Sequence, residues 1–221
     1  MLVRTNAVNR RSAEGQLGAL AGGQIFSSEF KYRRGTEIFG EGEGTEYVYQ
    51  IISGAVRTYK LLSDGRRQIN AFYLPGDIFG LENGASHRFT ADAIVETSVS
   101  IMRQSGLLDI IAVCRTGEGS LLSLVTRNLE HAETHMLLLG RKTALERVAA
   151  FLLEMDERLM HPDVMILPMS RRDIADYLGV TLETVSRTLS ILRDECLLQF
   201  DGPTQRRVVL LDRTGLAKLE V

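Results

Sequence analysis

The stretch "SRRDIADYLGVTLETVSRTLSIL", residues 170–192, decides the fold of the C-terminal part of the chain. Its first half has the pattern of a short capped helix. Ser170 supplies an N-cap, and Asp173 three residues later completes a capping box. Ile174 and Leu178 form the apolar stripe by which such a helix is buried. We therefore expect a short helix that begins after Ser170.

The second half predicts a turn and a second helix. Gly179 ends the first helix, because glycine adopts the left-handed backbone conformation without steric cost. Thr181 then caps the next helix. The apolar positions of this second helix are Leu182, Val185, Leu189 and Leu192. Two helices joined by a glycine-containing turn of this length predict a helix-turn-helix.

Glu183, Ser186 and Arg187 lie on the side of the second helix that its apolar residues avoid. Polar residues on a helix are usually a solvated face, but the N-terminal half of a recognition helix meets base edges. Arginine can donate two hydrogen bonds to guanine, and glutamate can accept one from cytosine. The following run "LLQFDGPTQRRVVLL" (197–211) predicts two strands around Asp-Gly-Pro, a hairpin or wing. In this context we expect DNA reading.

The N-terminal part, from about Ile25 to Met102, has a strand-like pattern of short apolar runs between glycines. Ser-Gly at 53–54, Asp-Gly at 64–65 and Pro-Gly at 75–76 recur every 11 residues. Turns at this spacing predict an antiparallel barrel or roll. The glycine-rich "RRGTEIFGEGEG" lacks the Gly-Lys-Ser/Thr of a phosphate-binding loop, so tight turns explain it better.

Between these parts, from about Gly117 to Gly140, apolar residues recur at alternating steps of three and four. A period of 3.5 predicts the a/d seam of a two-helix coiled coil, although a helix packed within its own chain remains the alternative. The seam consists of Leu122, Val125, Leu129, Ala132, Met136 and Leu139. His131 and His135 could in principle share a metal ion. We interpret them instead as solvated positions that flank the seam.

Composition limits the function classes. The net charge of −2 means that a nucleic-acid partner must meet a local basic patch. Cys114 and Cys196 lie far apart and offer neither a disulfide framework nor metal-ligand spacing, which suits a reducing cytoplasm. No apolar run reaches the roughly 18–20 residues of a membrane span. No catalytic constellation stands out, so we expect no enzyme, no cofactor and no membrane partner.

From about residue 25 to residue 220 the chain resembles the Crp/Fnr family of bacterial transcription regulators. "ETVSR" (183–187) and "LLLGRKTALERVAAFLL" (137–153) are similar to its Fnr and FixK branch. The resemblance implies an α+β fold with an N-terminal antiparallel β-roll like cyclic-nucleotide-binding domains, a long dimerisation helix and a C-terminal winged helix-turn-helix. The implied division is a flexible tail (1–24), the β-roll (25–116), the dimerisation helix (117–140) and the DNA-binding domain (141–221).

The resemblance also implies residue roles. Glu183 and Arg187 would read the half-site, and Ser186 would help to distinguish the Fnr type. Leu182 stands where members like the cyclic-AMP receptor carry a base-reading arginine, which implies a TTGAT-N4-ATCAA palindrome. The partners implied are double-stranded DNA, RNA polymerase and a second copy of the chain, with activation as the expected outcome. The expected DNA-backbone contacts are Ser170, Arg172, Thr181, Thr184, Arg206 and Arg207.

An effector is not expected from the residues present. The tail lacks the cysteines that hold the iron–sulfur cluster of Fnr, and Cys114 alone cannot supply four thiolates. Glu82 and Arg88 depart in order and spacing from the family's nucleotide-binding motif, and haem binding through His87 has still less support. We therefore expect a FixK-like regulator without an effector. The alternative is a ligand-gated regulator whose effector binds the β-roll.

Cys196 is expected to be a small buried hydrophobic residue. The alternative is an exposed thiol whose oxidation disturbs the wing. FixK-type relatives use such a cysteine, but the matching position is the start of the first helix of the motif, where this chain has Ser170. We therefore predict that mild peroxide leaves DNA binding largely intact.

Overall fold

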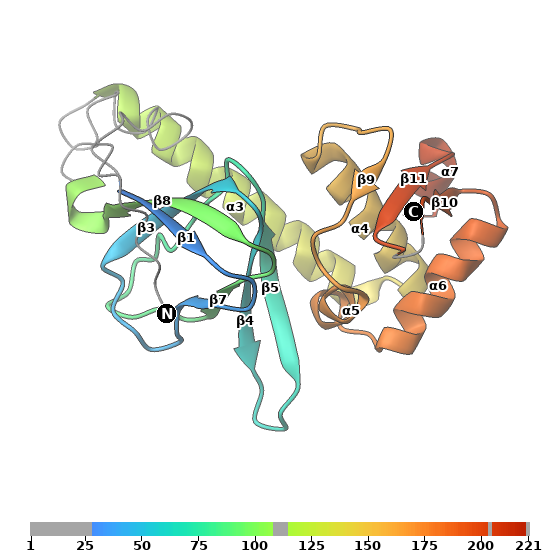
Figure 1. Ribbon diagram of the computed structural model, residues 1–221, viewed down its shortest axis with the longest axis horizontal. Helices are drawn as coiled ribbons and strands as arrows, with labels where there is room; N and C mark the ends of the chain where they lie inside the picture. Colours follow the sequence, from blue (N-terminus) through green and yellow to red (C-terminus); the bar gives the residue numbers. More distant parts are fainter. Residues whose placement is uncertain (1–27, 108–114, 203–204, 220–221) are drawn as a thin grey trace. The chain divides into compact units, whose positions relative to one another are not determined.

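The computed structural model describes residues 28–107, 115–202 and 205–219 (Figure 1). The predicted tail and Cys114 lie outside the described residues. The chain divides into two compact units, one that ends at Glu130 and one that begins at His131. Each unit is described separately below.

The N-terminal unit contains two four-stranded antiparallel sheets (Figure 1). The first has the order β1-β8-β3-β6, and the second has the order β2-β7-β4-β5. Neighbouring strands pair antiparallel throughout, as a β-roll requires, so the expected fold class of this part is confirmed. The strands of the first sheet are β1 (Ser28–Tyr32), β8 (Thr97–Arg103), β3 (Tyr47–Ser53) and β6 (Ile78–Phe79). Those of the second are β2 (Glu37–Phe39), β7 (Thr90–Ala93), β4 (Val56–Leu61) and β5 (Arg67–Tyr73).

Aromatic side chains from both sheets form the centre of this unit. The Phe39 ring lies 5.5 Å from that of Tyr49 and 6.1 Å from that of Phe79. All three are buried together with Val56 and Val99. Contacts of this kind stabilise a core beyond the area that they bury.

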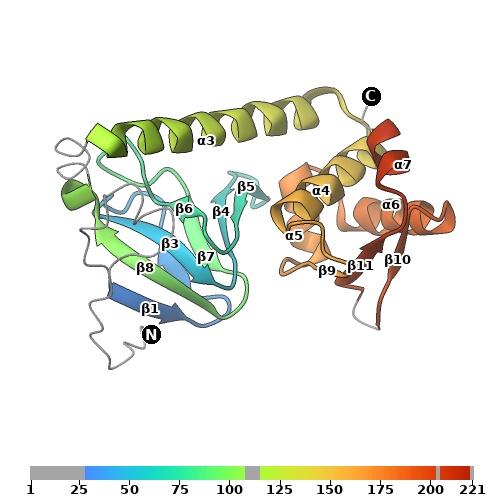
Figure 2. The same cartoon turned by 90° about the horizontal axis from the view of Figure 1, so that it is seen from above.

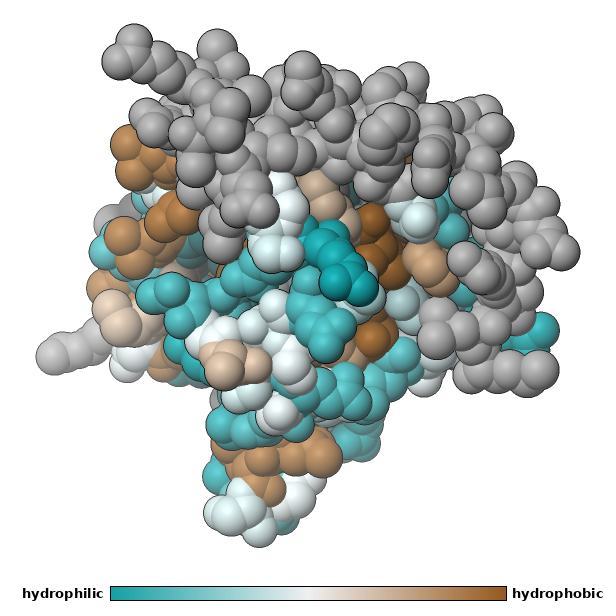
Figure 3. All heavy atoms as spheres, turned by 90° about the vertical axis from the view of Figure 1, so that its left-hand side faces the viewer, coloured by the Kyte–Doolittle hydropathy of each residue, from teal (hydrophilic) through white to brown (hydrophobic). Residues whose placement is uncertain are grey.

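The glycines that recur every 11 residues do form the predicted turns. Gly54, Gly65 and Gly76 all have positive φ, at 93°, 84° and 96°. At Gly54 an added Cβ would lie 2.5 Å from the carbonyl oxygen of Glu96, so space as well as conformation requires glycine. The hairpin of β4 and β5 projects at the bottom of Figure 3, where apolar surface is visible. Leu61 and Leu62 are exposed at the end of β4.

Helix α3 (Arg115–Arg141) contains the predicted seam. Leu124 and Leu138, which are not seam positions, are the buried leucines among the side chains described on this helix. Ala132 is exposed, Leu139 is half-buried, and the other four predicted seam residues are at least half exposed. The seam is therefore an uncovered apolar stripe in the single chain.

The C-terminal unit packs four helices around a small sheet (Figure 2). Met165–Ile166 (β9), Leu198–Phe200 (β10) and Arg207–Leu210 (β11) form an antiparallel sheet of order β10-β11-β9. Its helices are α4 (Ala144–Arg158), α5 (Arg171–Leu178), α6 (Leu182–Asp194) and α7 (Arg213–Lys218). This is the expected winged helix-turn-helix. None of the helices in the described ranges is long and apolar enough to cross a membrane.

The boundary between the two compact units lies inside α3, between Glu130 and His131. The physical reason is that the helix begins to pack against α4 and α5 at His131, whose ring contacts Glu154 and Tyr177. The last turns of α3 are therefore part of the same compact unit as the helix-turn-helix.

Candidate nucleic-acid interface

Helix α5 starts with the predicted capping box. The Ser170 hydroxyl accepts from the backbone amide of Asp173 (3.2 Å), and the Asp173 carboxylate accepts from the amide (2.9 Å) and the hydroxyl (2.7 Å) of Ser170. The helix buries Ile174, Ala175 and Leu178, as their apolar character predicts. Reciprocal bonds of this kind satisfy amide groups that would otherwise have no partner at a helix start.

The turn between α5 and α6 also follows the prediction. Gly179 has φ 65° and ψ 34°, a left-handed C-cap, and its amide donates to the carbonyl of Ala175. Thr181 caps α6, and its hydroxyl accepts from the amide of Thr184 at 3.2 Å. These local bonds fix where α6 begins and therefore which of its residues face outward.

Helix α6 buries Val185, Thr188, Leu189 and Leu192. Leu182, the first of the apolar positions, is half-buried in the first turn. Thr188 is buried as well, which the apolar pattern missed because threonine is polar. Glu183 and Arg187 are exposed and Ser186 is half-buried, so the three predicted base-reading side chains share the outer side of the helix.

Glu183 is electrostatically prepared to act as an acceptor. Hydrogen bonds from its own backbone amide and from the Thr181 hydroxyl lower the pKa of its carboxyl group. The positive charges of Arg172 and Arg187 lower this pKa further. The carboxylate is therefore ionised at neutral pH, as an acceptor for a base amino group must be.

Arg171 was missed by the sequence analysis. Its Nη1 donates to the Ser186 hydroxyl across 3.3 Å, and its guanidinium carbon lies 5.5 Å from the centre of the Phe200 ring. Because Ser186 is on α6 and Phe200 ends strand β10, this side chain connects the recognition helix with the base of the wing. No local pattern could have shown this contact, since the partners are far apart in the sequence.

The residues expected to contact the DNA backbone fall into two groups. The hydroxyls of Ser170 and Thr181 cap α5 and α6, and the Thr184 hydroxyl lies 3.0 Å from that of Thr181. Arg172 is exposed beside α6. On the wing strand, Arg207 forms an ion pair with Asp201 at 2.7 Å, which reduces the charge available for phosphate. Arg206 is half-buried.

Arg147 joins the ends of three segments beneath this surface. Its guanidinium donates to the carbonyls of Leu139 (2.9 Å), Lys142 (2.9 Å) and Leu178 (2.8 Å). These carbonyls belong to the last turn of α3, the link to α4 and the last residue of α5. A single cation thus satisfies backbone groups that helix ends leave without partners.

The interpretation of the two histidines as solvated was wrong. His135 stacks on Tyr177 of α5 with ring centres 4.1 Å apart, and both of its ring nitrogens are buried without a hydrogen-bond partner. His131 Nε2 lies 3.2 Å from Glu154 and 3.3 Å from the Tyr177 hydroxyl. Burial, with the charge of His131, lowers the pKa of His135 to about 4. The heptad pattern missed this, because it describes a single face of the helix.

The predicted burial of Cys196 was also wrong: the residue is exposed. It follows the C-cap of α6 with φ 58°, so it occupies a left-handed turn position instead of the packed end of a helix.

In the β-roll, the carboxylate of Glu82 is bound by residues that follow it closely in the sequence. Its carboxylate lies 3.1 Å from Nδ1 of His87 and accepts from the backbone amide of Arg88 at 3.1 Å. His87 is itself buried and stacks on Phe39 with ring centres 3.6 Å apart. Glu82 and His87 therefore serve as internal contacts of the roll.

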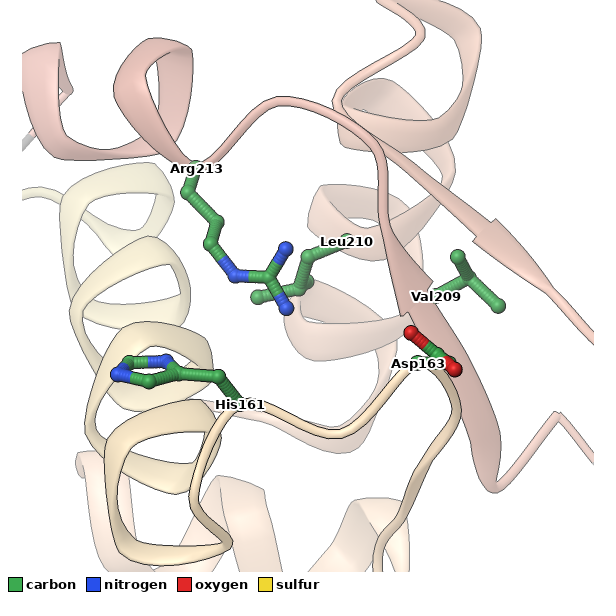
Figure 4. A pocket seen from close by; sticks show the side chains of 5 residues that line it. All are labelled: His161, Asp163, Val209, Leu210 and Arg213. Atoms are coloured by element: carbon green, nitrogen blue, oxygen red, sulfur yellow. The ribbon is translucent and has the colours of Figure 1, made fainter.

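A hollow of about 530 Å³ lies elsewhere on the C-terminal unit, between the loop after α4, strand β11 and helix α7 (Figure 4). The guanidinium of Arg213 and the ring of His161 border it. Both side chains bind Asp156, which is 1% exposed: Arg213 donates at 2.7 and 2.9 Å, and His161 Nδ1 lies at 2.6 Å. This cluster holds α4 to α7. Within the described residues no group of three or more histidine, cysteine or acidic side chains is arranged for a metal ion.

Known families match both units. Residues 146–219 match the Crp-like helix-turn-helix domain, and residues 29–113 match the cyclic nucleotide-binding domain. The chain is 44% identical over 199 residues to the nitrogen fixation regulation protein FixK of Azorhizobium caulinodans, covering 86% of this chain and 77% of that protein. It is 45% identical over 167 residues to FixK of Rhizobium meliloti, covering 76% of each.

A solved structure agrees with these sequence relatives. FixK2 from Bradyrhizobium japonicum superposes with a TM-score of 0.85 and 56% sequence identity, covering 89% of this chain and 98% of that chain. Other relatives bear names of transcriptional activators, among them FnrA of Stutzerimonas stutzeri, which is 32% identical over 193 residues, covering 85% of this chain and 78% of that protein. The chain therefore belongs to the Crp/Fnr family of transcription regulators, in its FixK-like branch.

Proposed function

We propose that this regulator binds a TTGAT-N4-ATCAA palindrome as a homodimer, through α6, without a small-molecule effector. The observation that carries the proposal is the outer side of α6. There an ionised Glu183 and an exposed Arg187 stand on the N-terminal half of a helix whose start is fixed by Thr181. Such a helix end is the part that enters the major groove in this motif.

Each side chain has a distinct role in this proposal. Arg187 donates to O6 and N7 of a guanine, and Glu183 accepts from the amino group of a cytosine. Ser186 contacts a neighbouring base edge. Arg172, with its exposed guanidinium, contacts a phosphate and so contributes affinity without sequence preference. Arg206 and Arg207 bind phosphates of the DNA backbone from the wing. Arg207 does so after its ion pair with Asp201 has opened.

Dimerisation through the seam of α3 is supported by its exposure. The exposed fractions are 68% for Leu122, 50% for Val125, 56% for Leu129 and 66% for Met136. A second copy of the helix would cover this stripe with knobs-into-holes packing. A two-fold dimer would also present two recognition helices to the two halves of a palindrome, about 34 Å apart.

A matched pair of variants tests the seam. Leu129→Glu should raise the dissociation constant of the dimer by 100-fold or more, because it places two carboxylates in an apolar contact. This corresponds to a loss of about 3 kcal/mol or more in the free energy of dimerisation. Leu137→Glu is the control, since Leu137 is 67% exposed on the same helix but outside the seam. Sedimentation equilibrium compares the two. An equal effect of both variants would contradict the seam assignment.

The absence of an effector is supported by the internal partners of Glu82 and by the departures of this region from the nucleotide-binding motif. In the competing proposal, a ligand binds the roll and populates the DNA-binding state. DNA affinity measured at one salt concentration, with and without cyclic nucleotides, distinguishes them. A tenfold or larger gain with nucleotide would favour the ligand-gated regulator.

Selection from random-sequence DNA tests the whole proposal. The purified protein without additions should enrich the proposed palindrome with its four-base spacer. Arg187→Ala should cost about 1–3 kcal/mol on the enriched site and relax the preference for its guanine. Arg172→Gln should weaken all sequences equally and flatten the salt dependence. Enrichment of an unrelated motif, or equal losses on specific and random DNA for Arg187→Ala, would overturn the proposal.

We further propose that the bound dimer activates transcription by contacting RNA polymerase. A relative that is 43% identical over 165 residues bears the name transcriptional activatory protein AadR, from Rhodopseudomonas palustris. Transcription in vitro from a promoter with the selected site should rise when the protein is added. A fall would instead identify a repressor at that promoter.

A further inference from the structure

Arg171 makes contacts that helix stability does not explain. It is the first residue of α5, where the helix macrodipole disfavours a positive charge. Its side chain is half-buried, and this burial lowers its pKa. The neighbouring Arg172 keeps its side chain exposed. The position of Arg171 therefore carries an electrostatic cost, which the interactions of its guanidinium with Ser186 and Phe200 offset.

The two contacts hold the guanidinium between the recognition helix and the wing. The hydrogen bond to Ser186 Oγ spans 3.3 Å, and the Phe200 ring faces the guanidinium at 5.5 Å. Stacking on an aromatic face favours the planar arginine cation and limits its rotation. The ring thus keeps the donor directed at Ser186.

We infer that Arg171 is a positioning residue that makes the Ser186 hydroxyl a hydrogen-bond donor toward DNA. The inference rests on the proposed binding of DNA through α6. A serine hydroxyl can donate or accept, and it rotates to suit its partner. Arginine can only donate, so the Ser186 oxygen uses one of its two lone pairs to accept from Arg171, and its single proton remains for another partner. The positive guanidinium beside this oxygen disfavours a second donor at the remaining lone pair.

This polarity predicts which bases Ser186 accepts. In the major groove, thymine O4, guanine O6 and the N7 atoms of purines are acceptors, whereas cytosine offers an amino donor. A hydroxyl whose oxygen lies beside a guanidinium therefore favours an acceptor edge and disfavours the amino group of cytosine. Without Arg171 the hydroxyl would rotate freely and lose this preference.

Binding to a panel of half-sites, with all four bases at each position, tests the inference. The full-length proteins are the wild type, Ser186→Ala, Arg171→Gln, their double variant and Arg172→Gln. Ser186→Ala and Arg171→Gln should each reduce discrimination against cytosine at the same base position by about fivefold. This is the change in affinity expected for the loss of one hydrogen bond. The double variant should lose no more than Ser186→Ala alone, because both changes remove one interaction.

Arg172→Gln is the control, with a uniform loss at all positions expected. If Arg171→Gln gives the same uniform loss, or if its effect adds to that of Ser186→Ala, Arg171 contacts DNA by itself and the inference is wrong. If the wild type shows no base preference, or Ser186→Ala leaves the preferences unchanged, the proposed base reading itself fails, and the inference with it. Phe200→Leu is a second variant, which leaves the charge of Arg171 in place. It should reduce discrimination against cytosine about twofold at the base position that Ser186→Ala affects. An effect at another base position would overturn the inference.

Discussion

Replacement of His135 by phenylalanine should remove an acid sensitivity from the C-terminal unit. Burial keeps the His135 ring neutral, with its pKa lowered from 6.5 to about 4. In the unfolded chain the same ring takes up a proton as the pH falls through 6.5. A histidine with a lowered folded-state pKa thus contributes almost no protonation penalty at neutral pH and destabilises progressively as the pH falls from 6.5 to 4. Phenylalanine keeps a ring against Tyr177 but does not titrate.

The magnitude follows from the shift. Full linkage for a change from 6.5 to about 4 amounts to about 2 kcal/mol at pH 5 relative to pH 7. His135 as a whole residue is half-buried, so solvent screening reduces this figure to about 1 kcal/mol. At neutral pH, His135→Phe should be stabilising by up to about 1 kcal/mol, because both ring nitrogens are buried without partners.

The other titratable groups around the ring are present in both the wild type and His135→Phe. The acid that lies close to it, Glu154, changes charge at a lower pH than the range of the experiment. His131 of α3, Glu154 and Arg158 of α4 and Tyr177 of α5 surround this position. Burial raises the pKa of Glu154, but the hydrogen bond and charge of His131 and the charge of Arg158 outweigh it, so the net shift is downward. The stabilisation from Glu154 is therefore lost only as the pH falls below about 4.5.

Two measurements check the prediction. The chain has four histidines, so NMR of ring protons in histidine-labelled protein can follow each one. Urea unfolding of the wild type and of His135→Phe, each between pH 4.5 and pH 7, gives the difference in free energy. The reasoning is refuted if His135 titrates near 6.5, or if the difference between the two proteins does not change with pH.

Three further changes test other contacts by urea or thermal unfolding. Arg147→Ala should cost about 2 kcal/mol, because it leaves three carbonyls at helix ends without their donor, and Arg147→Lys should recover only part of this; an unchanged stability would contradict the assigned role. Arg213→Ala should cost about 2 kcal/mol at neutral pH, since Asp156 remains buried. Because the Arg213 hydrogen bond lowers the pKa of Asp156, that cost should disappear as the pH falls below about 3.8, and a cost independent of pH would disprove the pairing. Cys196→Gly should stabilise by about 0.5–1 kcal/mol through relief of the left-handed conformation, whereas Cys196→Ser should not; equal effects would argue against strain at this position.

The elements that the sequence predicted well are those whose determinants are local. The capping box at Ser170, the left-handed Gly179 and the cap at Thr181 all act within three or four residues, so the amino-acid sequence alone predicts the helix-turn-helix. The turns at Gly54, Gly65 and Gly76 are of the same kind. In each case a short stretch contains both the residue and the backbone group that it satisfies.

The features that could not be predicted join residues far apart in the sequence. Arg171 reaches Ser186, Tyr177 reaches His131, and Arg213 reaches Asp156 only after the helices have packed. A heptad pattern assigns one face of α3, but it says nothing of the face that carries the two histidines. Cys196 was misjudged for a related reason, because burial was expected from residue type while its turn conformation decides its exposure.

The position of the unit boundary within α3 has a consequence for the proposed dimer. Leu122, Val125 and Leu129 precede the boundary, whereas Met136 and Leu139 follow it and belong to the compact unit of the helix-turn-helix. A partner helix that covers the whole stripe would therefore contact both units of each protomer. The same last turns of α3 bind α4 and α5 through His131, His135 and Arg147. In such a dimer the separation of the two α6 helices would depend on the seam and on these buried contacts together. Sequence specificity for a fixed spacer would then require both to be intact.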